Sequence, residues 1–296
     1  MKINKIRWIK LNGLINVDKP KGYTSFDVIR KLKKILNMKK IGHTGTLDPL
    51  ATGVLVICLG RATKLANVIE AKEKTYIADF VLGSKTDTYD TEGEVIDKSD
   101  IKVTFEDVKN ILSKFRGEIK QVPPMYSALK VDGKRLYELA REGIVIERKS
   151  RDVTISKLEL MEFDEDTQTG KLYCDVSKGT YIRSLIFDMG EELKTYAHMN
   201  GLRRTKVGEY IVEDGFTIEQ MQEMGEKDDL SFVTSIEDSF DFEKVEITDE
   251  KQLKLFLNGN TVICKKPNDR YKIYNDKKFI GLGEVINDRL KGWKVF

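Results

Sequence analysis

One carboxylate is well placed to do chemistry: Asp48, in the loop formed by residues 42–53. Three glycines and one proline give this loop a defined shape, and the apolar run at 54–59 after it indicates a buried strand. Asp48 precedes the proline, which favours extended backbone geometry. Reactive groups are often carried on loops held by a rigid scaffold. From these residues alone, an Asp-Pro turn without a chemical role remains the alternative.

The elements that must position this loop can be predicted from hydrophobic patterning. We expect a helix from Ser25, as its N-cap, to about Leu36, after a turn at 20–22. A second helix is expected at 182–193, and an acidic one around 219–224. The predicted strands are 54–59, 76–82, 154–163 and 171–176. This mixture of sheet and helix predicts an α+β fold.

Charge is distributed unevenly along the 296 residues, although the net charge is only +3. Residues 213–250 hold 14 acidic and 2 basic side chains, whereas residues 251–296 hold 11 basic and 4 acidic ones. Residues 17–40 hold 8 basic and 2 acidic side chains. Local basic density of this kind attracts polyanions through phosphate contacts, although a solvated lysine-rich helix face is the simpler alternative.

The apolar runs and the cysteines of the sequence indicate the compartment of the protein and whether it binds a metal. No apolar run approaches the ~20 residues of a membrane-spanning helix, and residues 1–17 lack the apolar core of a signal peptide. The three cysteines lie far apart, and their spacing matches no zinc motif. We therefore expect a cytoplasmic protein with no membrane association and no bound metal.

Eight segments of the chain form an ordered series of motifs: 17–25, 42–53, 60–64, 74–76, 86–90, 123–130, 179–183 and 201–205. In the same order, they resemble the motifs of the TruB family of tRNA pseudouridine synthases. The longest match is the loop at 42–53, which resembles that family's catalytic loop, and the resemblance covers residues 12–212. Residues 243–296 resemble, more weakly, the PUA-type RNA-binding module attached to this family.

The resemblance implies a pseudouridine synthase fold with a mixed, mainly antiparallel central sheet. It implies a catalytic domain at 1–242 and a small β-rich, PUA-like module at 243–296. The expected activity is isomerisation of uridine to pseudouridine at position 55, in the T-loop of tRNA. Donor and acceptor are the same uridine, so no cofactor is expected. We further expect a monomer that needs no protein partner.

Roles for individual residues follow from the same resemblance. Asp48 would be the essential carboxylate, Arg183 its cationic partner and Tyr76 the ring that stacks on the target base. Tyr181 and Leu202 would support and wall the pocket. His43 would fill the gap left by the flipped base, and Asp90 would bind that base or order its own loop. The candidates for phosphate contact are Lys19, Lys64, Lys130, Arg203 and Arg204.

An ordinary structural role remains the alternative for most of these residues. Tyr76 and Leu202 are also compatible with ordinary core packing, Arg183 with an exposed surface position and His43 with a loop histidine bonded to backbone groups. His198 has no such support from the motifs and is interpreted as structural.

Other functions remain to be weighed against this one. A tRNA-binding folding helper would need binding but no chemistry, and one protein can combine this secondary role with the enzymatic one. A guide-RNA-dependent rRNA pseudouridylase would need protein partners and a larger RNA-binding module. The short C-terminal segment favours the stand-alone enzyme. A glycosidase that only cleaves is disfavoured, because no second carboxylate is a convincing acid.

Overall fold

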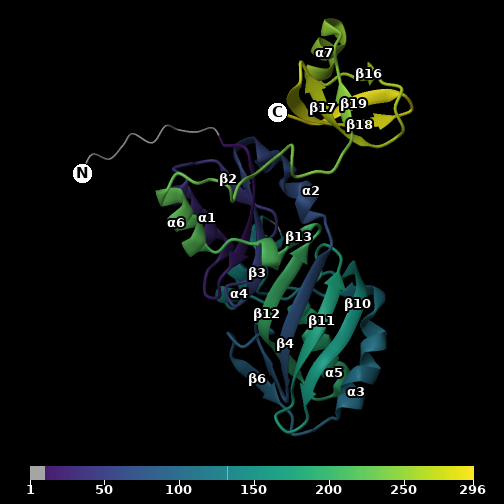
Figure 1. Cartoon of the computed structure of the whole chain (residues 1–296). Coiled ribbons are helices and arrows are strands. Elements are labelled where there is room, and N and C mark those ends of the chain that lie inside the picture. Colours follow the sequence, from purple (N-terminus) through teal and green to yellow (C-terminus); the bar gives the residue numbers. More distant parts are fainter. Residues whose placement is uncertain (1–10, 132) are drawn as a thin grey trace, which may run out of the picture.

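The computed structural model describes residues 11–131 and 133–296. The prediction that no signal peptide is present concerns residues 1–17, and residues 1–10 of that segment lie outside the described residues. Among the described residues, the larger sheet has ten strands, and its main path runs β14-β1-β3-β12-β4-β11-β10-β7. Their bounds are Thr234–Ser235, Gly13–Lys19, Thr52–Leu59, Ala197–Val207, Lys74–Leu82, Thr169–Val176, Arg151–Asp164 and Gly117–Gln121. Figure 1 shows β12, β4, β11 and β10 of this path side by side.

The larger sheet is mixed and mainly antiparallel, as expected. Along the path, β12 and β3 pair in parallel, and each of the other pairs of neighbouring strands is antiparallel. Two short strands lie off the path: β2 (Ile41–His43) pairs with β3, and β13 (Tyr210–Ile211) pairs with β12. The fold is therefore α+β with a mixed central sheet.

The strand β3 explains why residues 54–59 form one continuous apolar run. Leu55, Ile57 and Leu59 enter the main core on one face of the sheet. Val54, Val56 and Cys58 enter a second apolar cluster on the other face. A strand buried on both faces needs no polar alternation, so its sequence is uniformly apolar. The loop with Asp48 is thus followed at once by a rigid central strand.

Helices cover the sheet and complete the main core. α5 (Ile182–Leu193) contacts β12 and β4, and α3 (Phe105–Ile111) packs against both α5 and β10. α1 (Ser25–Ile35) packs against α6 (Ile218–Glu226). The apolar side chains of α1 that enter the core are Val28, Ile29 and Leu32. The helix at 182–193 is confirmed, and the acidic helix is confirmed with slightly wider bounds.

The N-cap of α1 corrects the sequence-based prediction. Thr24, not Ser25, is the cap: its side chain accepts from the Asp27 backbone, and the Asp27 carboxylate accepts from the Thr24 backbone. This reciprocal pair satisfies two backbone donors that the first turn of a helix leaves free. Ser25 lies inside the first turn, and its hydroxyl bonds to the loop that carries Asp48.

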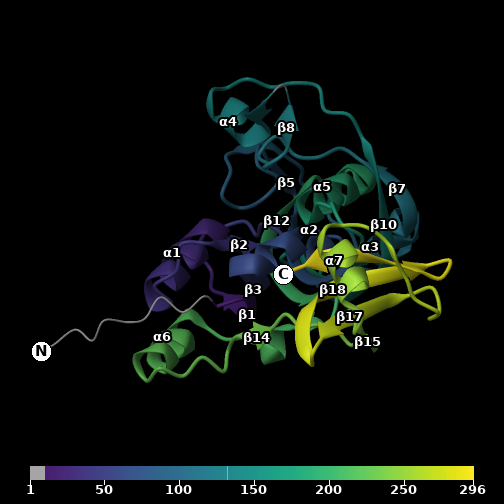
Figure 2. The ribbon, with the colours of Figure 1, turned by 90° about the horizontal axis from the view of Figure 1, so that it is seen from above.

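Several segments project from the sheet or connect its strands. Residues 122–150, between β7 and β10, carry β8 (Lys130–Val131), β9 (Lys134–Arg135) and α4 (Leu136–Arg141), which stand away from the sheet in Figure 2. A small cluster of Met125, Leu136 and Leu139 stabilises this segment. The remaining elements are β5 (Ser84–Thr86), β6 (Val95–Lys98), α2 (Ala66–Glu70) and the 3-10 turns Gly60–Leu65, Leu112–Phe115 and Val212–Asp214.

The C-terminal residues form a second, five-stranded sheet in the order β15-β17-β18-β19-β16. Its bounds are Lys244–Glu246, Arg270–Asn275, Lys278–Ile286, Arg289–Val295 and Val262–Ile263, and α7 (Glu250–Leu257) packs against it. Phe256, Tyr271 and Ile273 lie in its own core. The β-rich character predicted here is confirmed, while the division into domains at 242 stays a prediction.

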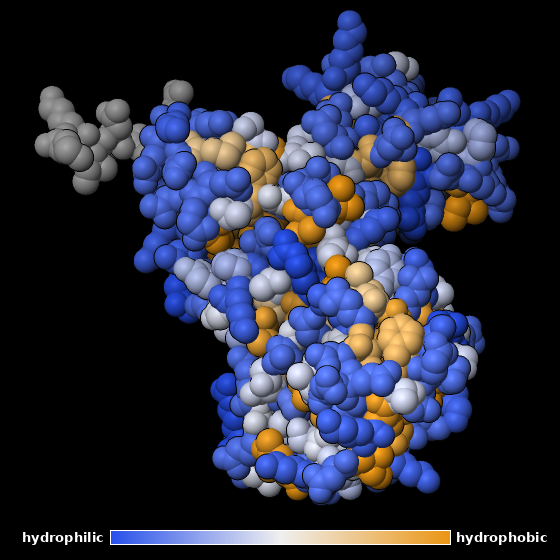
Figure 3. All heavy atoms as spheres, turned by 60° about the horizontal axis from the view of Figure 1, so that its bottom comes forward, coloured by the Kyte–Doolittle hydropathy of each residue, from blue (hydrophilic) through white to orange (hydrophobic). Residues whose placement is uncertain are grey.

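Hydrophilic side chains predominate on the face drawn in Figure 3, and apolar atoms lie there in small separate groups. Within residues 11–131 and 133–296, no helix is long and apolar enough to cross a membrane.

Candidate active site

The loop with Asp48 is anchored at several points by α1 and by the turn before it. The Ser25 hydroxyl accepts from the Leu47 backbone N–H at 2.9 Å and lies 3.1 Å from the Leu47 carbonyl oxygen, to which it can donate. The backbone N–H of Gly22 donates to the Pro49 carbonyl at 2.8 Å. Both neighbours of Asp48 are therefore bonded to the N-terminal end of the α1 region, which limits the freedom of the carboxylate between them.

The glycine at position 53 is required where this loop enters β3. Its φ is +100°, and a Cβ there would lie 2.2 Å from the Arg204 carbonyl oxygen on the neighbouring strand. A side chain would therefore push β3 away from β12.

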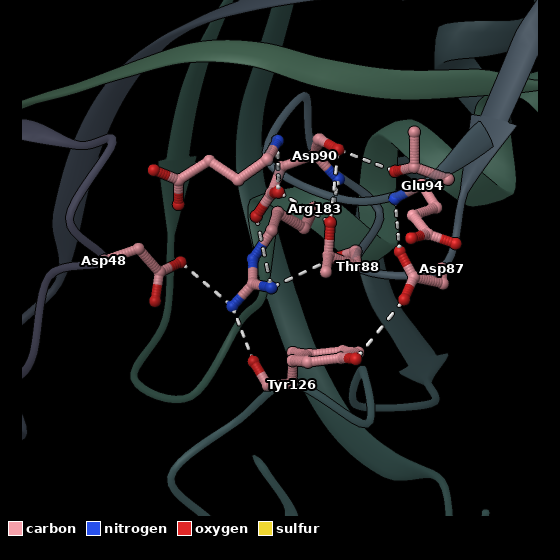
Figure 4. Close-up of polar contacts among 9 residues, drawn as sticks. Asp48, Asp87, Thr88, Asp90, Glu94, Tyr126 and Arg183 are labelled. Carbon is pink, nitrogen blue, oxygen red and sulfur yellow. Dashed lines mark hydrogen bonds and ion pairs between the residues drawn. The ribbon is translucent and has the colours of Figure 1, made fainter. Parts of the chain in front are cut away.

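Arg183 brings together parts of the chain that lie far apart in the sequence (Figure 4). Its Nη2 is 2.9 Å from a carboxylate oxygen of Asp48, and its Nη1 is 3.3 Å from one of Asp90. It also donates to the carbonyls of Thr88 at 3.0 Å and Tyr126 at 2.8 Å. The Arg183 side chain is 5% exposed, and that of Asp48 is 36% exposed. The arginine is thus fully engaged, while Asp48 remains open to a substrate.

Asp90 is buried and pairs with Nη1 of Arg183, whereas Asp48 pairs with Nη2. Its carboxylate accepts from the Thr88 hydroxyl at 2.7 Å and from the Glu92 backbone at 3.0 Å. Only 3% of the residue is exposed. Of the two roles expected for it, these contacts match ordering of its own loop, because its oxygens are occupied by Arg183 and by that loop.

A pocket of about 380 Å³ opens beside Asp48. That volume is in the range of small-ligand sites. Tyr76 on β4, Tyr181 just before α5 and Leu202 on β12 line it together with Asp48 and Arg183. The structure therefore brings the predicted catalytic residues and both predicted wall residues to one cavity. The backbone of Tyr181 is held by the Gln121 side chain in two hydrogen bonds of 3.0 and 2.8 Å.

The two histidines lie apart from that cavity lining. His43 is half-buried on β2, and its Nδ1 accepts from the Gly45 backbone at 3.3 Å. Burial, and then the charge of Arg204, lowers the pKa of His43. The ring is therefore neutral near pH 7, and an apolar stacking role suits it. His198 is buried and contacts Ser84, which fits the structural role expected for it.

Two of the five candidates for phosphate contact are buried, and the structure corrects those assignments. The Lys19 ammonium donates to the carbonyls of Pro20 at 2.9 Å, Tyr23 at 2.6 Å and Pro49 at 3.4 Å. Burial lowers its pKa to about 8. Arg204 is 2% exposed and donates to the carbonyls of Val54 and Gly45. Both side chains hold the loop that carries Asp48 by binding backbone oxygens, which leaves them unsuited to a surface phosphate.

The other three candidates are at least partly exposed. Lys130 is exposed on β8, next to the pocket-lining Leu129. Arg203 is 42% exposed and pairs with Asp18 at 2.9 Å. Lys64 is exposed and donates to the Val295 carbonyl at 2.9 Å, so it links the main body of the protein to the C-terminal sheet.

Sequence reasoning missed several residues that line the same pocket. They are Glu70, Lys74, Ser127, Arg151 and Lys178. Lys74 and Ser127 lie inside segments that resemble family motifs, which is the one signal that points to them. Lys178 lies directly before such a segment and Arg151 lies far from any of them, so only the fold reveals that both line the pocket.

Replacing Ser25 with alanine is expected to destabilise the protein by about 1–3 kcal/mol and to slow catalysis, because buried Leu47 loses a backbone hydrogen-bond partner. Urea unfolding and single-turnover rates measure the two effects. Ser113→Ala, which removes an exposed hydroxyl bonded to Asn110, is the matched control. Equal behaviour of the two variants would show that Ser25 does not hold the loop.

The chain is similar to known proteins over most of its length. A model described as TruB family pseudouridylate synthase (N terminal domain) matches residues 33–182, and one described as tRNA pseudouridylate synthase B C-terminal domain matches residues 183–237. The tRNA pseudouridine synthase B of Fusobacterium nucleatum is 52% identical over 97% of this chain and 100% of its own length. That of Clostridium tetani is 45% identical over 95% of this chain and 98% of its own.

A solved structure shares the fold at lower identity. The archaeal box H/ACA sRNP Nop10–Cbf5 complex matches with a TM-score of 0.68 and 25% identity, over 96% of this chain and 85% of that one.

The fold and the site thus define a pseudouridine synthase, an isomerase that acts on RNA. The chain belongs to the TruB family, and its relatives establish it as an enzyme of tRNA modification. The resemblance predicted from the sequence motifs is confirmed. The two matched models end at residue 237, so the PUA-like nature of residues 243–296 stays a prediction.

Proposed function

We propose that this enzyme acts on the T-loop uridine at position 55 of tRNA and that Asp48 is its catalytic carboxylate. The observation that carries the proposal is the ion pair of Asp48 with the buried Arg183 at the edge of a pocket. A carboxylate that acts as a nucleophile or charge stabiliser must be ionised, and an adjacent guanidinium favours that form. Because Asp48 is also partly exposed, a substrate sugar can reach it.

The reaction balances without an oxidant or a reductant. The bond from N1 of uracil to C1′ breaks, the uracil turns within the pocket, and a new bond joins C5 to C1′. The C5 hydrogen leaves as a proton, and N1 gains one. Asp48 either attacks the sugar or assists the cleavage, and both routes use it as an anion. The enzyme therefore needs to hold the detached base rather than to supply a cofactor.

The pocket walls suit a flipped pyrimidine. Flipping costs a few kcal/mol of lost stacking, and base–aromatic stacking of ~1–3 kcal/mol replaces part of it. Tyr76 is the proposed stacking partner, Leu202 an apolar wall and Tyr181 a support. His43 is proposed to fill the gap in the RNA, since its ring is neutral near pH 7 and half-buried beside the loop.

The RNA contacts outside the pocket are proposed to involve Lys64, Lys130 and Arg203, which are at least partly exposed. RNA hairpins are bound by shape and by splayed-out bases rather than through a duplex groove. We propose that the C-terminal sheet contributes to this binding as a PUA-like module. The proposed enzyme is a cytoplasmic monomer that needs neither guide RNA nor a protein partner.

Mapping the modified nucleotide tests the proposed site. Purified protein and an unmodified tRNA transcript, with EDTA and no added cofactor, are expected to give one pseudouridine, at the T-loop position. Carbodiimide labelling with primer extension locates it, and a transcript with cytidine at that position is the control. Modification at another uridine would overturn the assignment of the site. A requirement for added RNA or protein would favour the guide-dependent alternative.

A further inference from the structure

Two polar side chains that line the catalytic pocket lack hydrogen-bond partners in the part of the chain that the structure describes. They are Ser127, through its hydroxyl, and Arg151, through Nε and Nη2. Ser127 is only 4% exposed. A buried donor without an acceptor is destabilising by about 1–3 kcal/mol, so such groups usually have a functional reason to persist. Both groups lie where the RNA substrate is proposed to bind.

Arg151 is held in place by stacking rather than by an acceptor. Its guanidinium lies 4.6 Å from the centroid of the Tyr181 ring. Its Nη1 faces Gly179, where a Cβ would lie 3.4 Å away. Arg151 begins β10 and pairs with Gln121 of β7, the residue whose side chain also anchors the Tyr181 backbone. The guanidinium is therefore positioned in advance, beside the ring that supports the pocket.

The charges around the pocket indicate an anionic ligand. Five cationic side chains line it against two carboxylates, Asp48 and Glu70. Asp48 pairs with Arg183 at 2.9 Å, and Glu70 pairs with Lys178 at 3.4 Å. Among the described residues, neither carboxylate is bonded to Nε or Nη2 of Arg151. A bound ligand can supply the acceptor that these two donors lack.

The donor chemistry of Ser127 and Arg151 further limits the class of ligand that can bind them. A guanidinium is a donor only, and a serine hydroxyl can donate to a charged oxygen. A phosphodiester offers only acceptors and a negative charge, whereas the uracil edge also presents an N–H donor. Ser127 follows Tyr126, whose carbonyl accepts from Arg183 at 2.8 Å. Ser127 is thus near the reacting centre, as the phosphate of the flipped nucleotide would be.

We propose that Ser127 and Arg151 bind the phosphodiester group of the flipped nucleotide, an assignment that rests on the proposed function. The contact forms only when RNA enters the pocket, and it places the sugar beside Asp48. Both are substrate-binding residues for the isomerisation. The neighbouring cations Lys74 and Lys178 raise the local positive potential without being the direct ligands.

Three variants test the proposal, and two control variants come from β10, the strand that Arg151 begins. Arg151→Gln, Arg151→Lys and Ser127→Ala are compared with Lys157→Ala, which removes a cation stacked at 4.7 Å on Tyr173 outside the pocket. Ser156→Ala, which removes an exposed hydroxyl of β10, is the control for Ser127. The measurements are the dissociation constant for tRNA as a function of salt, the single-turnover rate and the melting temperature.

Arg151→Gln is expected to weaken tRNA binding about tenfold or more, since hydrogen bonds to charged groups are the stronger ones. It is also expected to reduce the slope of log affinity against log salt by about 0.7–0.9, the value of one phosphate contact. Arg151→Lys is expected to keep the wild-type salt slope, because the charge remains. Its affinity for tRNA is expected to lie between those of Arg151→Gln and the wild type, because an ammonium lacks the planar, two-pronged donor geometry of a guanidinium. Ser127→Ala weakens binding about threefold to tenfold, with no loss of melting temperature, because the hydroxyl has no partner to lose.

A purely structural role would give the opposite pattern: lower melting temperatures with an unchanged salt slope for Arg151→Gln. That pattern, or binding equal to that of the controls, would overturn the proposal. The proposed function can fail separately. The wild-type enzyme could modify a different uridine while Arg151→Gln still reduces the slope of log affinity against log salt. In that case the T-loop assignment fails and the phosphate contact stands.

Discussion

Replacing Asp48 with asparagine is expected to abolish pseudouridine formation, with a loss of about 10⁴-fold or more in the single-turnover rate. Asparagine keeps the size of the side chain but can neither attack C1′ nor carry the negative charge that the reaction needs. The affinity for tRNA is expected to stay within a few-fold of the wild type. Single-turnover rates at saturating enzyme, beside filter-binding measurements, separate the two effects.

Asp152→Asn is the matched control for Asp48→Asn, because Asp152 is exposed and pairs with Lys120 at the surface. It is expected to leave both the rate and the affinity unchanged. If Asp48→Asn retained a rate within tenfold of the wild type, another group would have to carry the chemistry. If it instead lost tRNA binding altogether, the residue would be part of the RNA-binding surface rather than the catalyst.

Replacing Arg183 with methionine is expected to lower the free energy of unfolding by about 3–5 kcal/mol, besides removing activity. The Asp90 side chain is 5% exposed and would be left as a buried charge without its cation. Two carbonyls, those of Thr88 and Tyr126, would also lose their donor. Asp48 contributes less to this loss, because its carboxylate can turn toward water.

A double variant distinguishes loss of the charge pair from loss of packing. Asp90→Asn in the Arg183→Met background removes the uncompensated carboxylate, so this double variant is expected to be more stable than Arg183→Met alone. Urea unfolding of the four members of the cycle gives the coupling energy. Catalysis is expected to stay absent in the double variant, because Asp48 still lacks its partner. Additive destabilisation by the two substitutions would contradict the account of this pair.

The local parts of the site could be predicted from sequence because local rules determine them. The apolar run of β3, the glycines of the loop before it and the bounds of α5 all depend on neighbours in the chain. Sequence spacing also determines the N-cap of α1. Thr24 is followed three residues later by Asp27, which completes a reciprocal cap, whereas Ser25 has no acidic residue at that spacing.

The contacts across the site could not be predicted from local patterns. Asp48 and Arg183 are 135 residues apart, and only their positions within family-like motifs suggested that they meet. Nothing in composition indicated that Asp90 is a second partner of the same guanidinium. The sequence makes Lys19 and Arg204 candidates for phosphate contact, but carbonyl acceptors supplied by loops and a neighbouring strand allow both to be buried.

The measurement that tests the central claim most directly uses tRNA that carries tritium at C5 of its uridines. Joining C5 to C1′ displaces that hydrogen, so the wild-type enzyme is expected to release one equivalent of tritium per tRNA, and Asp48→Asn none. Release of tritium by Asp48→Asn at the wild-type rate, or no release by the wild type despite bound tRNA, would contradict the account.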